Sequence, residues 1–276
     1  MSFRPVLLVA ATRRTAEDFW RLSHLGRSIE AMPPALRPEL AIRFENTGDR
    51  RLGLPTVYNK AIDSCPRGSH ILFVHDDVYI HDAFLGHRLT EGLSGADIIG
   101  LAGSRGSALE QPSWGLEFDA DLNGLGWQQG PGIQLSGAVS HGVRDATPHP
   151  PLVSLGAYGP VSADCDLLDG LFLAARIESL RLCGVRFDEQ FDFHLYDLDF
   201  CRQAKRAGLR LWTWPILVTH ASGGAFCTPE WKAGARRYLD KWAAMPSFLR
   251  SGEKRIRRSY NQYDSEYQTS VEVGSG

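Results

Sequence analysis

An acidic pair follows directly after a short apolar run in the first third of the chain. Residues 71–74 read Ile-Leu-Phe-Val, which is typical of a buried strand, and His75, Asp76 and Asp77 come next. Carboxylates at the end of a buried strand are costly to desolvate unless a cation or hydrogen-bond donors compensate their charge. Mg²⁺ or Mn²⁺ would do so, because such ions take one or two carboxylates and complete their shell with water and substrate phosphates. The alternative is that both aspartates cap the turn or the helix that follows.

A second acidic segment opens a predicted helix. Residues 196–201 are Tyr-Asp-Leu-Asp-Phe-Cys, and the positions that follow keep a helical period as far as Gly208. Acidic residues near a helix N-terminus are ordinary capping and dipole choices, so a structural role is one interpretation. The other is catalytic. We expect the helix terminus to keep Asp197 ionised, as a general base must be to take a proton from an attacking hydroxyl.

A histidine stands at the end of a late apolar run. His220 follows the predicted strand 211–218 and precedes the pair Gly223 and Gly224. A histidine at a strand end is more often a structural group than a ligand. A neutral imidazole nevertheless suits a borderline ion such as Mn²⁺, and the glycine pair would let the backbone approach a phosphate closely. Both interpretations stay open on the sequence alone.

Short apolar runs alternate with helical patterns along the chain. We expect strands at 6–11, 40–45, 71–74 and 98–102, and helices at 15–32, 55–64 and 82–93. An apolar segment at 167–175, a helix at 196–207, a strand at 211–218 and a last helix at 229–244 follow. This alternation predicts a single-domain α/β fold of the Rossmann-like type, with a mostly parallel sheet flanked by helices. Ligands of such sheets bind beyond the carboxyl ends of the strands.

The segment 104–159 has a different composition. It is rich in Gly, Pro and Ser, contains Trp114 and Trp127, and shows no clear period. We expect a long irregular loop with a hairpin. Loops of this length are uncommon in compact domains unless they bind or cover something, so the second interpretation is a flap that faces an acceptor substrate.

The bulk composition is that of an ordinary globular protein. The 276 residues are 43% hydrophobic and 22% charged, and the formal net charge of −2 gives no global field to attract nucleic acid. No apolar run is long enough to span a membrane, and the five cysteines include no Cys-x-x-Cys pair. We therefore expect a cytoplasmic protein.

The length favours one domain over residues 1–245 and a C-terminal tail over 246–276. Within that tail, residues 253–258 are Glu-Lys-Arg-Ile-Arg-Arg, a basic cluster. One interpretation is a solvated, partly flexible tail. The other is peripheral contact with anionic lipid at the inner face of a membrane, to which each basic residue near the surface contributes about 1 kcal/mol.

Four segments in a fixed order carry a resemblance to a known family. They are Tyr-Asn-Lys-Ala-Ile at 58–62, Phe-Val-His-Asp-Asp-Val at 73–78, Asp-Gly-Leu-Phe at 169–172, and the acidic helix start at 196–202. With His220 after a late strand, the chain resembles glycosyltransferase family 2 with its GT-A fold over roughly residues 5–245. The resemblance is closest to the branch typified by a streptomycin-biosynthesis glycosyltransferase domain, which has His-x-Asp in place of Asp-x-Asp.

The resemblance implies roles for individual residues. Asp77 would bind Mn²⁺ or Mg²⁺ on the donor diphosphate, with His75 and His220 as further ligands, and Asp197 would be the catalytic base. Tyr196 stands where the family usually has Glu. The donor side would be formed by Thr12, Glu45, Asn46, Asn59 and Asp76, although Glu45 and Asn46 also read as turn residues. The acceptor side would be formed by Asp169, Gly170, Tyr196 and Trp114.

The resemblance also implies a reaction. A sugar would pass with inversion from a UDP-, GDP- or dTDP-sugar to the hydroxyl of a glycan, lipid-linked or protein acceptor, in surface polysaccharide or other glycoconjugate assembly. One alternative is a non-catalytic nucleotide-sugar-binding protein, because Tyr196 replaces an acid. A second is a metal-dependent nucleotidyltransferase or phosphoesterase, which would need more histidine and aspartate ligands clustered on helices.

Overall fold

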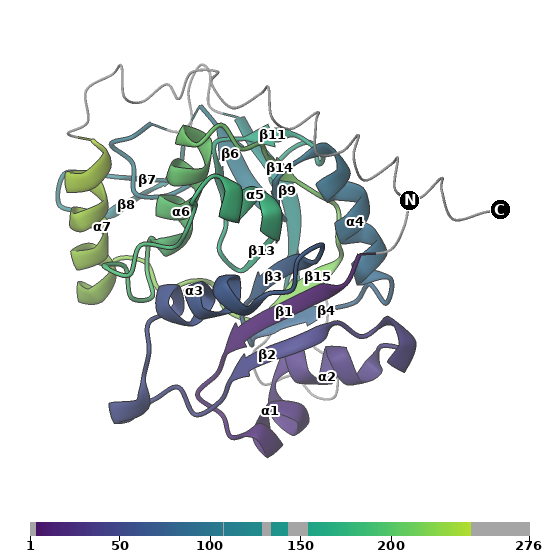
Figure 1. Ribbon diagram of the computed structural model, residues 1–276. Coiled ribbons are helices and arrows are strands. Elements are labelled where there is room, and N and C mark those ends of the chain that lie inside the picture. The colour runs from purple at the N-terminus through teal and green to yellow at the C-terminus, as the bar shows by residue number, and fades with distance from the viewer. Residues whose placement is uncertain (1–3, 107, 129–133, 143–153, 244–276) are drawn as a thin grey trace.

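A computed structural model describes residues 4–106, 108–128, 134–142 and 154–243, and every structural statement below concerns these residues. Two sheets and their flanking helices surround one continuous hydrophobic core (Figure 1). The expected α/β class is therefore confirmed. The tail 246–276, with its basic cluster at 253–258, lies outside the described residues.

The larger sheet has seven strands in the order β11-β14-β5-β13-β3-β1-β2. Their bounds are Val6–Ala11 (β1), Glu39–Arg43 (β2), His70–Val74 (β3), Ile98–Gly100 (β5), Asp164–Cys165 (β11), Phe172–Arg176 (β13) and Leu211–Thr213 (β14). β1 pairs in parallel with both β2 and β3, and β14 with β5, whereas β13 is antiparallel to β3 and β5, and β11 to β14. The sheet is thus mixed, and its parallel part carries the carboxyl ends of β1 and β3 to one edge.

The smaller sheet crosses this edge. Its strand order is β12-β6-β9-β15-β4, and β10 pairs with β9. The bounds are Val78–Ile80 (β4), Ala102–Arg105 (β6), Gln134–His141 (β9), Ser154–Ala157 (β10), Leu167–Leu168 (β12) and Val218–His220 (β15). A separate hairpin consists of β7 (Leu116–Phe118) and β8 (Gly124–Trp127). β4 follows β3 after only three residues, so the chain passes from one sheet to the other at the acidic strand end.

Seven α-helices are present in the described part of the chain. They are Ala16–Leu22 (α1), His24–Ala31 (α2), Leu54–Ser64 (α3), Leu85–Gly95 (α4), Ile177–Leu182 (α5), Tyr196–Arg206 (α6) and Pro229–Trp242 (α7), with short 3₁₀ turns at Pro34–Leu36 and Gly48–Arg50. Figure 1 shows α3 lying across β1 and β3, with α1 and α2 on the side of β2 and β4. None of the described helices has the length and hydropathy of a membrane span.

The single helix expected at 15–32 is two helices. Ser23 ends α1 and caps α2, because its hydroxyl accepts a hydrogen bond from the Gly26 amide at 2.9 Å and donates one to the Phe19 carbonyl at 2.7 Å. A Cβ on Gly26 would lie 2.3 Å from the Phe19 carbonyl oxygen, so the sharp turn needs glycine there. Because Ser23 is both the last cap of α1 and the first cap of α2, no loop separates the helices, and the apolar period continues across the break.

Two expected strands are divided between the sheets. The run 211–218 yields β14 and β15, with Pro215 between them, because proline lacks the amide that a continuing ladder needs. The run 98–102 yields β5 and the start of β6. Both divisions occur where the chain leaves the larger sheet for the smaller one.

The described part of 104–159 is more regular than expected. It contains the β7–β8 hairpin and the strands β9 and β10, and β9 lies between β6 and β15 in the smaller sheet. The strand pattern is weak because small residues replace apolar ones at tight contacts. Gly137 has φ 94°, and a Cβ there would lie 1.9 Å from the Leu101 carbonyl oxygen.

The last helix is fixed to α6 by a buried carboxylate. Asp199 is fully buried and accepts hydrogen bonds from Trp242 Nε1 at 2.8 Å and Gln203 Nε2 at 2.7 Å, and Lys241 Nζ lies 2.7 Å from it. Removing one member of such a network leaves a charge buried without compensation, which is strongly destabilising. The position of α7 is therefore coupled to the helix that carries Asp197.

A buried histidine at the start of β3 gives the fold a pH dependence. His70 is 3% exposed, and neither ring nitrogen has a hydrogen-bond partner within the described structure. Burial, with smaller contributions from Arg4 and Arg176, lowers its pKa from 6.5 to about 4. The unfolded chain binds this proton more readily than the folded one, so His70 costs no stability above about pH 6.5 and destabilises the fold progressively as the pH falls toward 4.

We predict that His70→Leu reduces the loss of stability in acid. Between pH 6.5 and pH 5, urea unfolding of the wild type should lose about 2 kcal/mol more than the variant, since each unit of pKa difference corresponds to about 1.4 kcal/mol. Other buried histidines titrate in both proteins and cancel in the comparison. Equal losses in both proteins would show that His70 is not the group responsible.

Candidate active site

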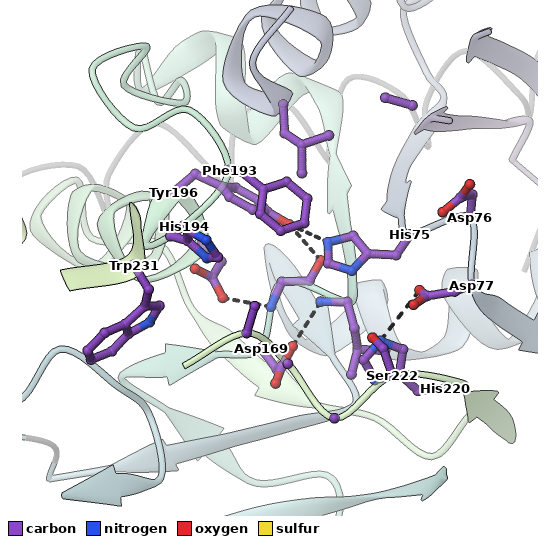
Figure 2. A pocket seen from close by; sticks show the side chains of 18 of the residues that line it. His75, Asp76, Asp77, Asp169, Phe193, His194, Tyr196, His220, Ser222 and Trp231 are labelled. Atoms are coloured by element: carbon purple, nitrogen blue, oxygen red, sulfur yellow. Dashed lines mark hydrogen bonds and ion pairs between the residues drawn. The ribbon is translucent and has the colours of Figure 1, made fainter. Parts of the chain in front are cut away.

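A cavity of about 1640 Å³ opens at the carboxyl ends of β1 and β3. Segments far apart in the chain line it, including 11–15, 74–77, 112–116, 169–171, 192–198 and 220–226. Drug-sized ligands occupy pockets of roughly 300–1,000 Å³, so this cavity has room for a larger ligand or for two substrates side by side. Figure 2 shows side chains from both sheets and from α6 directed toward this space.

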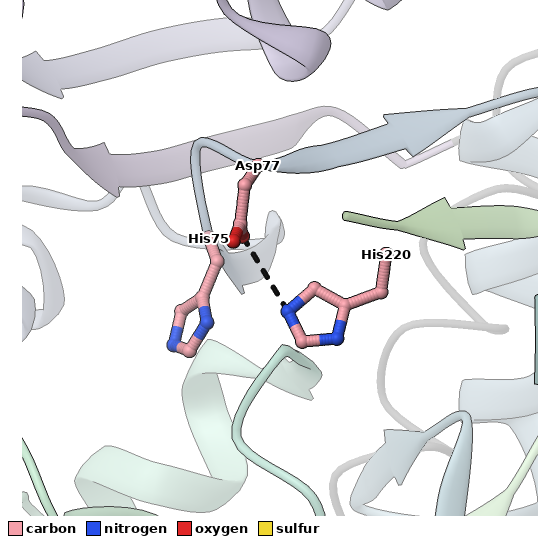
Figure 3. Close-up of side chains that lie close together, drawn as sticks. All are labelled: His75, Asp77 and His220. Atoms are coloured by element: carbon pink, nitrogen blue, oxygen red, sulfur yellow. Dashed lines mark ion pairs between the residues drawn. The ribbon is translucent and has the colours of Figure 1, made fainter. Parts of the chain in front are cut away.

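Three potential metal ligands meet at one side of the cavity. Ligand atoms of His75, Asp77 and His220 all lie within 4.8 Å of one another. The strand register brings them together, because Val78 pairs with His220 between β4 and β15, and His75 directly follows β3. His220 Nε2 is 3.5 Å from Asp77 Oδ1, and the ring of His75 lies beside them (Figure 3). These are the three ligands expected from the sequence.

The electrostatics of the three residues suit a cation. Burial alone would raise the pKa of Asp77, but hydrogen bonding and the charge of His220, with that of His75, hold it well below its usual range. Burial lowers the pKa of His75, which favours the neutral imidazole that ligates metals. Two imidazoles and one carboxylate are a donor set for a borderline divalent ion, and fit Mn²⁺ better than Mg²⁺, which prefers oxygen ligands.

Tyr196 orients one of these ligands. Its hydroxyl lies 2.8 Å from His75 Nε2 and donates to the Gly170 carbonyl at 3.1 Å. Since a phenol has one proton, it accepts from His75 Nε2–H, which leaves the Nδ1 lone pair of His75 for a cation. Tyr196 lines the cavity, as an acceptor-side residue would, but it is only 2% exposed and its hydroxyl is engaged with His75 and Gly170.

Asp197 is the second residue of α6 and faces the same cavity. Its Oδ2 accepts a hydrogen bond from the Gly170 amide at 2.9 Å. A Cβ on Gly170 would lie 2.7 Å from both Asp197 Cβ and the Tyr196 hydroxyl, so only glycine permits this approach. The backbone of one residue, Gly170, therefore contacts both the candidate base and the residue that orients His75.

The expectation that the helix terminus keeps Asp197 ionised is wrong, because other effects on its pKa are larger. Burial and the charge of Asp169 raise its pKa to about 7, although hydrogen bonds from the backbone amides of residues 170, 197 and 198 oppose the shift. The amides of the helix terminus do lower the pKa of Asp197, but this effect is smaller than the increase caused by desolvation. A pKa of about 7 places the group in the range of an effective general base at neutral pH.

Asp169 connects the loop region to this centre. Trp114 Nε1 donates to Asp169 Oδ2 at 2.8 Å, and the Leu171 amide donates to Asp169 Oδ1 at 2.9 Å. Both Asp169 and Trp114 line the cavity. Asp169, Gly170 and Trp114, three residues expected on the acceptor side, thus lie together next to Asp197.

Three of the residues expected on the donor side, Thr12, Asn46 and Asp76, line the cavity. Thr12 and Asp76 line the cavity and are joined, because the Thr12 hydroxyl donates to Asp76 Oδ2 at 2.5 Å. Asn46 also lines it, but its amide closes the following turn by bonding both backbone groups of Leu52. This agrees with the turn interpretation as well as with a position beside the cavity.

Two donor-side expectations do not fit the structure. Asn59 is buried away from the cavity, where its amide bonds both backbone groups of Phe187 and the carboxylate of Glu189. Glu45 is exposed, has φ 49° and does not line the cavity, which is the behaviour of a turn residue. Asn59 therefore holds α3 to the segment before α6, and a direct donor contact for either residue is not supported.

Several lining residues were missed by the sequence analysis. The cavity is lined on the β1 side by Arg13 and Arg14, and elsewhere by Tyr158, Phe226 and Trp231. The two arginines follow the first strand directly, so their position at a strand end was a usable signal. The aromatic residues had none, because they come together only through the arrangement of the hairpin, β10 and α7.

Comparison with known proteins gives fold likenesses only. No protein-family model matches the sequence, and no curated protein matches it. The catalytic domain of Drosophila β1,4-galactosyltransferase 7, in a complex with xylobiose, is similar over 84% of this chain and 79% of its own, at 11% identity and a TM-score of 0.45. TarS 1–349 of S. aureus in complex with UDP is similar over 85% of this chain and 64% of its own, at 12% identity and a TM-score of 0.43. At these scores the likenesses carry no conclusion about activity.

We predict that Mn²⁺ binds at His75, Asp77 and His220 without nucleotide. Asp77→Asn should weaken binding by about 100-fold, because even partners that only orient metal ligands contribute 10- to 100-fold. Asp76→Asn is the matched control and should bind Mn²⁺ as the wild type does, since the Asp76 carboxylate is engaged by Thr12. Electron paramagnetic resonance of free Mn²⁺ measures both, and equal affinity in Asp77→Asn and wild type would contradict the assignment.

Proposed function

We propose that this chain is a metal-dependent glycosyltransferase that moves a sugar, with inversion, from a nucleoside-diphosphate donor to an acceptor hydroxyl in glycoconjugate assembly. One observation carries the proposal. The ligand trio His75, Asp77 and His220 and the carboxylate of Asp197 face one cavity and are joined through the backbone of Gly170. A cation site next to a base of neutral pKa is what a single displacement at an anomeric carbon requires.

Asp197 supplies the proton transfer in this proposal. Its carboxylate takes the proton of the acceptor hydroxyl as that oxygen attacks the anomeric carbon and the bond to the diphosphate breaks on the opposite face. The Gly170 amide holds the acceptor-facing carboxylate in place, and its pKa of about 7 matches a base working near neutral pH. Positioned bases of this kind contribute about 10²- to 10⁴-fold to rates.

The leaving diphosphate needs positive charge. A divalent cation held by His75, Asp77 and His220 supplies charge neutralisation on the departing phosphates when it is bound. Arg13 and Arg14 line the cavity beside Thr12 and add positive charge on the β1 side. A guanidinium matches phosphate oxygens in geometry and stays charged, so these arginines suit the donor half of the cavity.

Nucleotide binding is the first test of the proposed function. In a thermal-shift panel of UDP, GDP, dTDP and CDP, we expect one nucleotide to stabilise the protein with Mn²⁺ and to lose this effect with chelator. A ligand at 100 times its Kd adds about 2.7 kcal/mol, which corresponds to a shift of several degrees.

Asp77→Ala should abolish the metal-dependent shift without changing the melting temperature of the free protein by as much. If no nucleotide shifts the wild type, alone or as a sugar nucleotide, the proposed function fails. If one nucleotide binds but its sugar nucleotides are never turned over, a binding protein is the better description.

A pH profile tests the base. With the matching sugar nucleotide, release of nucleoside diphosphate should fall about tenfold per pH unit below pH 7, because the protonated form of Asp197 cannot accept a proton. Asp197→Asn should lower the rate by about 10²- to 10⁴-fold and keep donor affinity. Near-normal turnover in this variant would remove Asp197 from the mechanism.

Asp169→Asn is the matched variant for the same profile. It removes the like charge that helps to raise the pKa of Asp197, so the acid limb should move to lower pH. A general structural defect would lower the rate at every pH without moving the limb.

A further inference from the structure

An aromatic platform borders Asp169 in the cavity. It consists of Trp114, Trp127 and Tyr158, all of which line the cavity. The Trp114 and Tyr158 rings meet edge to face with centroids 5.1 Å apart, and the Trp127 centroid lies 5.3 Å from Tyr158 and 5.8 Å from Trp114. These residues come from three separate segments, so the cluster is a built feature of the fold.

The platform is held in place by polar contacts at its base. Trp114 Nε1 is bonded to Asp169, and the Tyr158 hydroxyl lies 3.1 Å from His141 Nε2. Trp127 packs over Gly115, where a Cβ would lie 2.8 Å from its ring. Trp114 and Tyr158 are therefore oriented before any ligand arrives, and Trp127 rests on a glycine that leaves room for the flat indole.

Trp127 is the exposed member of the platform. Its relative exposure is 46%, against 8% for Trp114. An exposed indole that lines a cavity keeps a large apolar face in water, which is unfavourable until another apolar face covers it. Trp127 also lines the cavity, so part of its exposed surface is available to a ligand there.

We propose that Trp127 is the stacking surface for a carbohydrate acceptor, and that the acceptor of this enzyme is a neutral saccharide. This inference rests on the proposed function and names its acceptor class. One face of a pyranose carries C–H groups that pack on the indole, while its hydroxyls point outward to accept and donate hydrogen bonds. Asp169 lies at the edge of the platform, and a carboxylate has more acceptor positions than Trp114 and Leu171 use.

Two other ligand classes fit the surroundings less well. An acyl chain over the platform would cover Asp169 and Asp197 without giving them hydrogen bonds, which is costly. A quaternary ammonium needs ring faces that converge on one point, whereas here the three rings pack on one another at interplanar angles of 54°, 82° and 46°. A saccharide satisfies the flat ring and the carboxylates together.

The direct test measures saccharide binding in the presence of Mn²⁺ and the matching nucleoside diphosphate. The probes are methyl glycosides of glucose, galactose, mannose and xylose and their common disaccharides, with choline and octanol as the alternative classes. Saturation-transfer NMR reports binding, and titration gives the dissociation constant. We expect at least one saccharide to bind, with Trp127→Ala weakening it about tenfold and Trp127→Phe retaining most of the affinity.

Leu125→Ala is the matched control. Leu125 is 63% exposed in the same β8 strand but does not line the cavity, so this variant should bind the saccharide as the wild type does. The nucleotide-dependent thermal shift should be the same in all three variants, which shows that each is folded and keeps its donor site.

The outcomes separate this inference from the proposed function. A nucleotide shift with no saccharide binding, with binding of choline or octanol instead, or with equal saccharide affinity in Trp127→Ala and wild type would overturn the stacking role while the donor site stands. Saccharide binding that depends on Trp127 but without any nucleotide shift would leave the sugar site in place and reject the glycosyltransferase.

Discussion

The backbone of Gly170 joins the two halves of the candidate site. Its amide bonds Asp197, and its carbonyl accepts from the Tyr196 hydroxyl that orients His75. No side chain fits at this position, because a Cβ would overlap both neighbours. The residue that would take the acceptor proton and the residue that would hold a cation are therefore set relative to each other by backbone geometry, which varies less than side-chain conformation.

The rest of the fold supports this contact. Gly170 lies just before β13, and β13 pairs with β3 so that Phe172 lies opposite Val74. This pairing fixes the position of His75, the residue after Val74. Asp77 directly precedes β4, whose first residue, Val78, pairs with His220 in the antiparallel register with β15. On the other side, α6 is anchored to α7 through Asp199 and Trp242. Strand pairing thus positions His75, Asp77 and His220, and helix packing positions Asp197. The two parts of the candidate site meet at Gly170.

The proximity of His75, Asp77 and His220 could be predicted because all three lie at or next to strand ends. An apolar run that stops at a histidine or an aspartate marks a sheet edge, and the carboxyl ends of parallel strands gather ligands there. Thr12 also stands at a strand end, whereas the close approach of α6 to Gly170 had no signal in the sequence beyond the motif that carried the family resemblance. The α/β class followed from the alternation of elements in the first hundred residues.

The remaining features depend on contacts that no local pattern records. The hydrogen bond between His75 and Tyr196 spans 121 positions, and the raised pKa of Asp197 results from burial that the helix-terminus argument ignored. Asn59 lies in a motif that carried the family resemblance, yet its amide is used to hold Phe187 and Glu189. The strand β9 was hidden because Gly137 and two serines replace apolar residues in its alternation, and Gly137 lies in tight contact with Leu101.

The β7–β8 hairpin forms a sheet of its own and pairs with neither of the two sheets that hold the candidate ligands and the base. Its hydrogen-bond ladder is closed within residues 116–127. Changes in its length or side chains therefore leave the registers of β3, β4, β13 and β15 untouched. This part of the cavity wall can therefore change, between related proteins or in the laboratory, without altering the strand pairing that positions His75, Asp77 and His220.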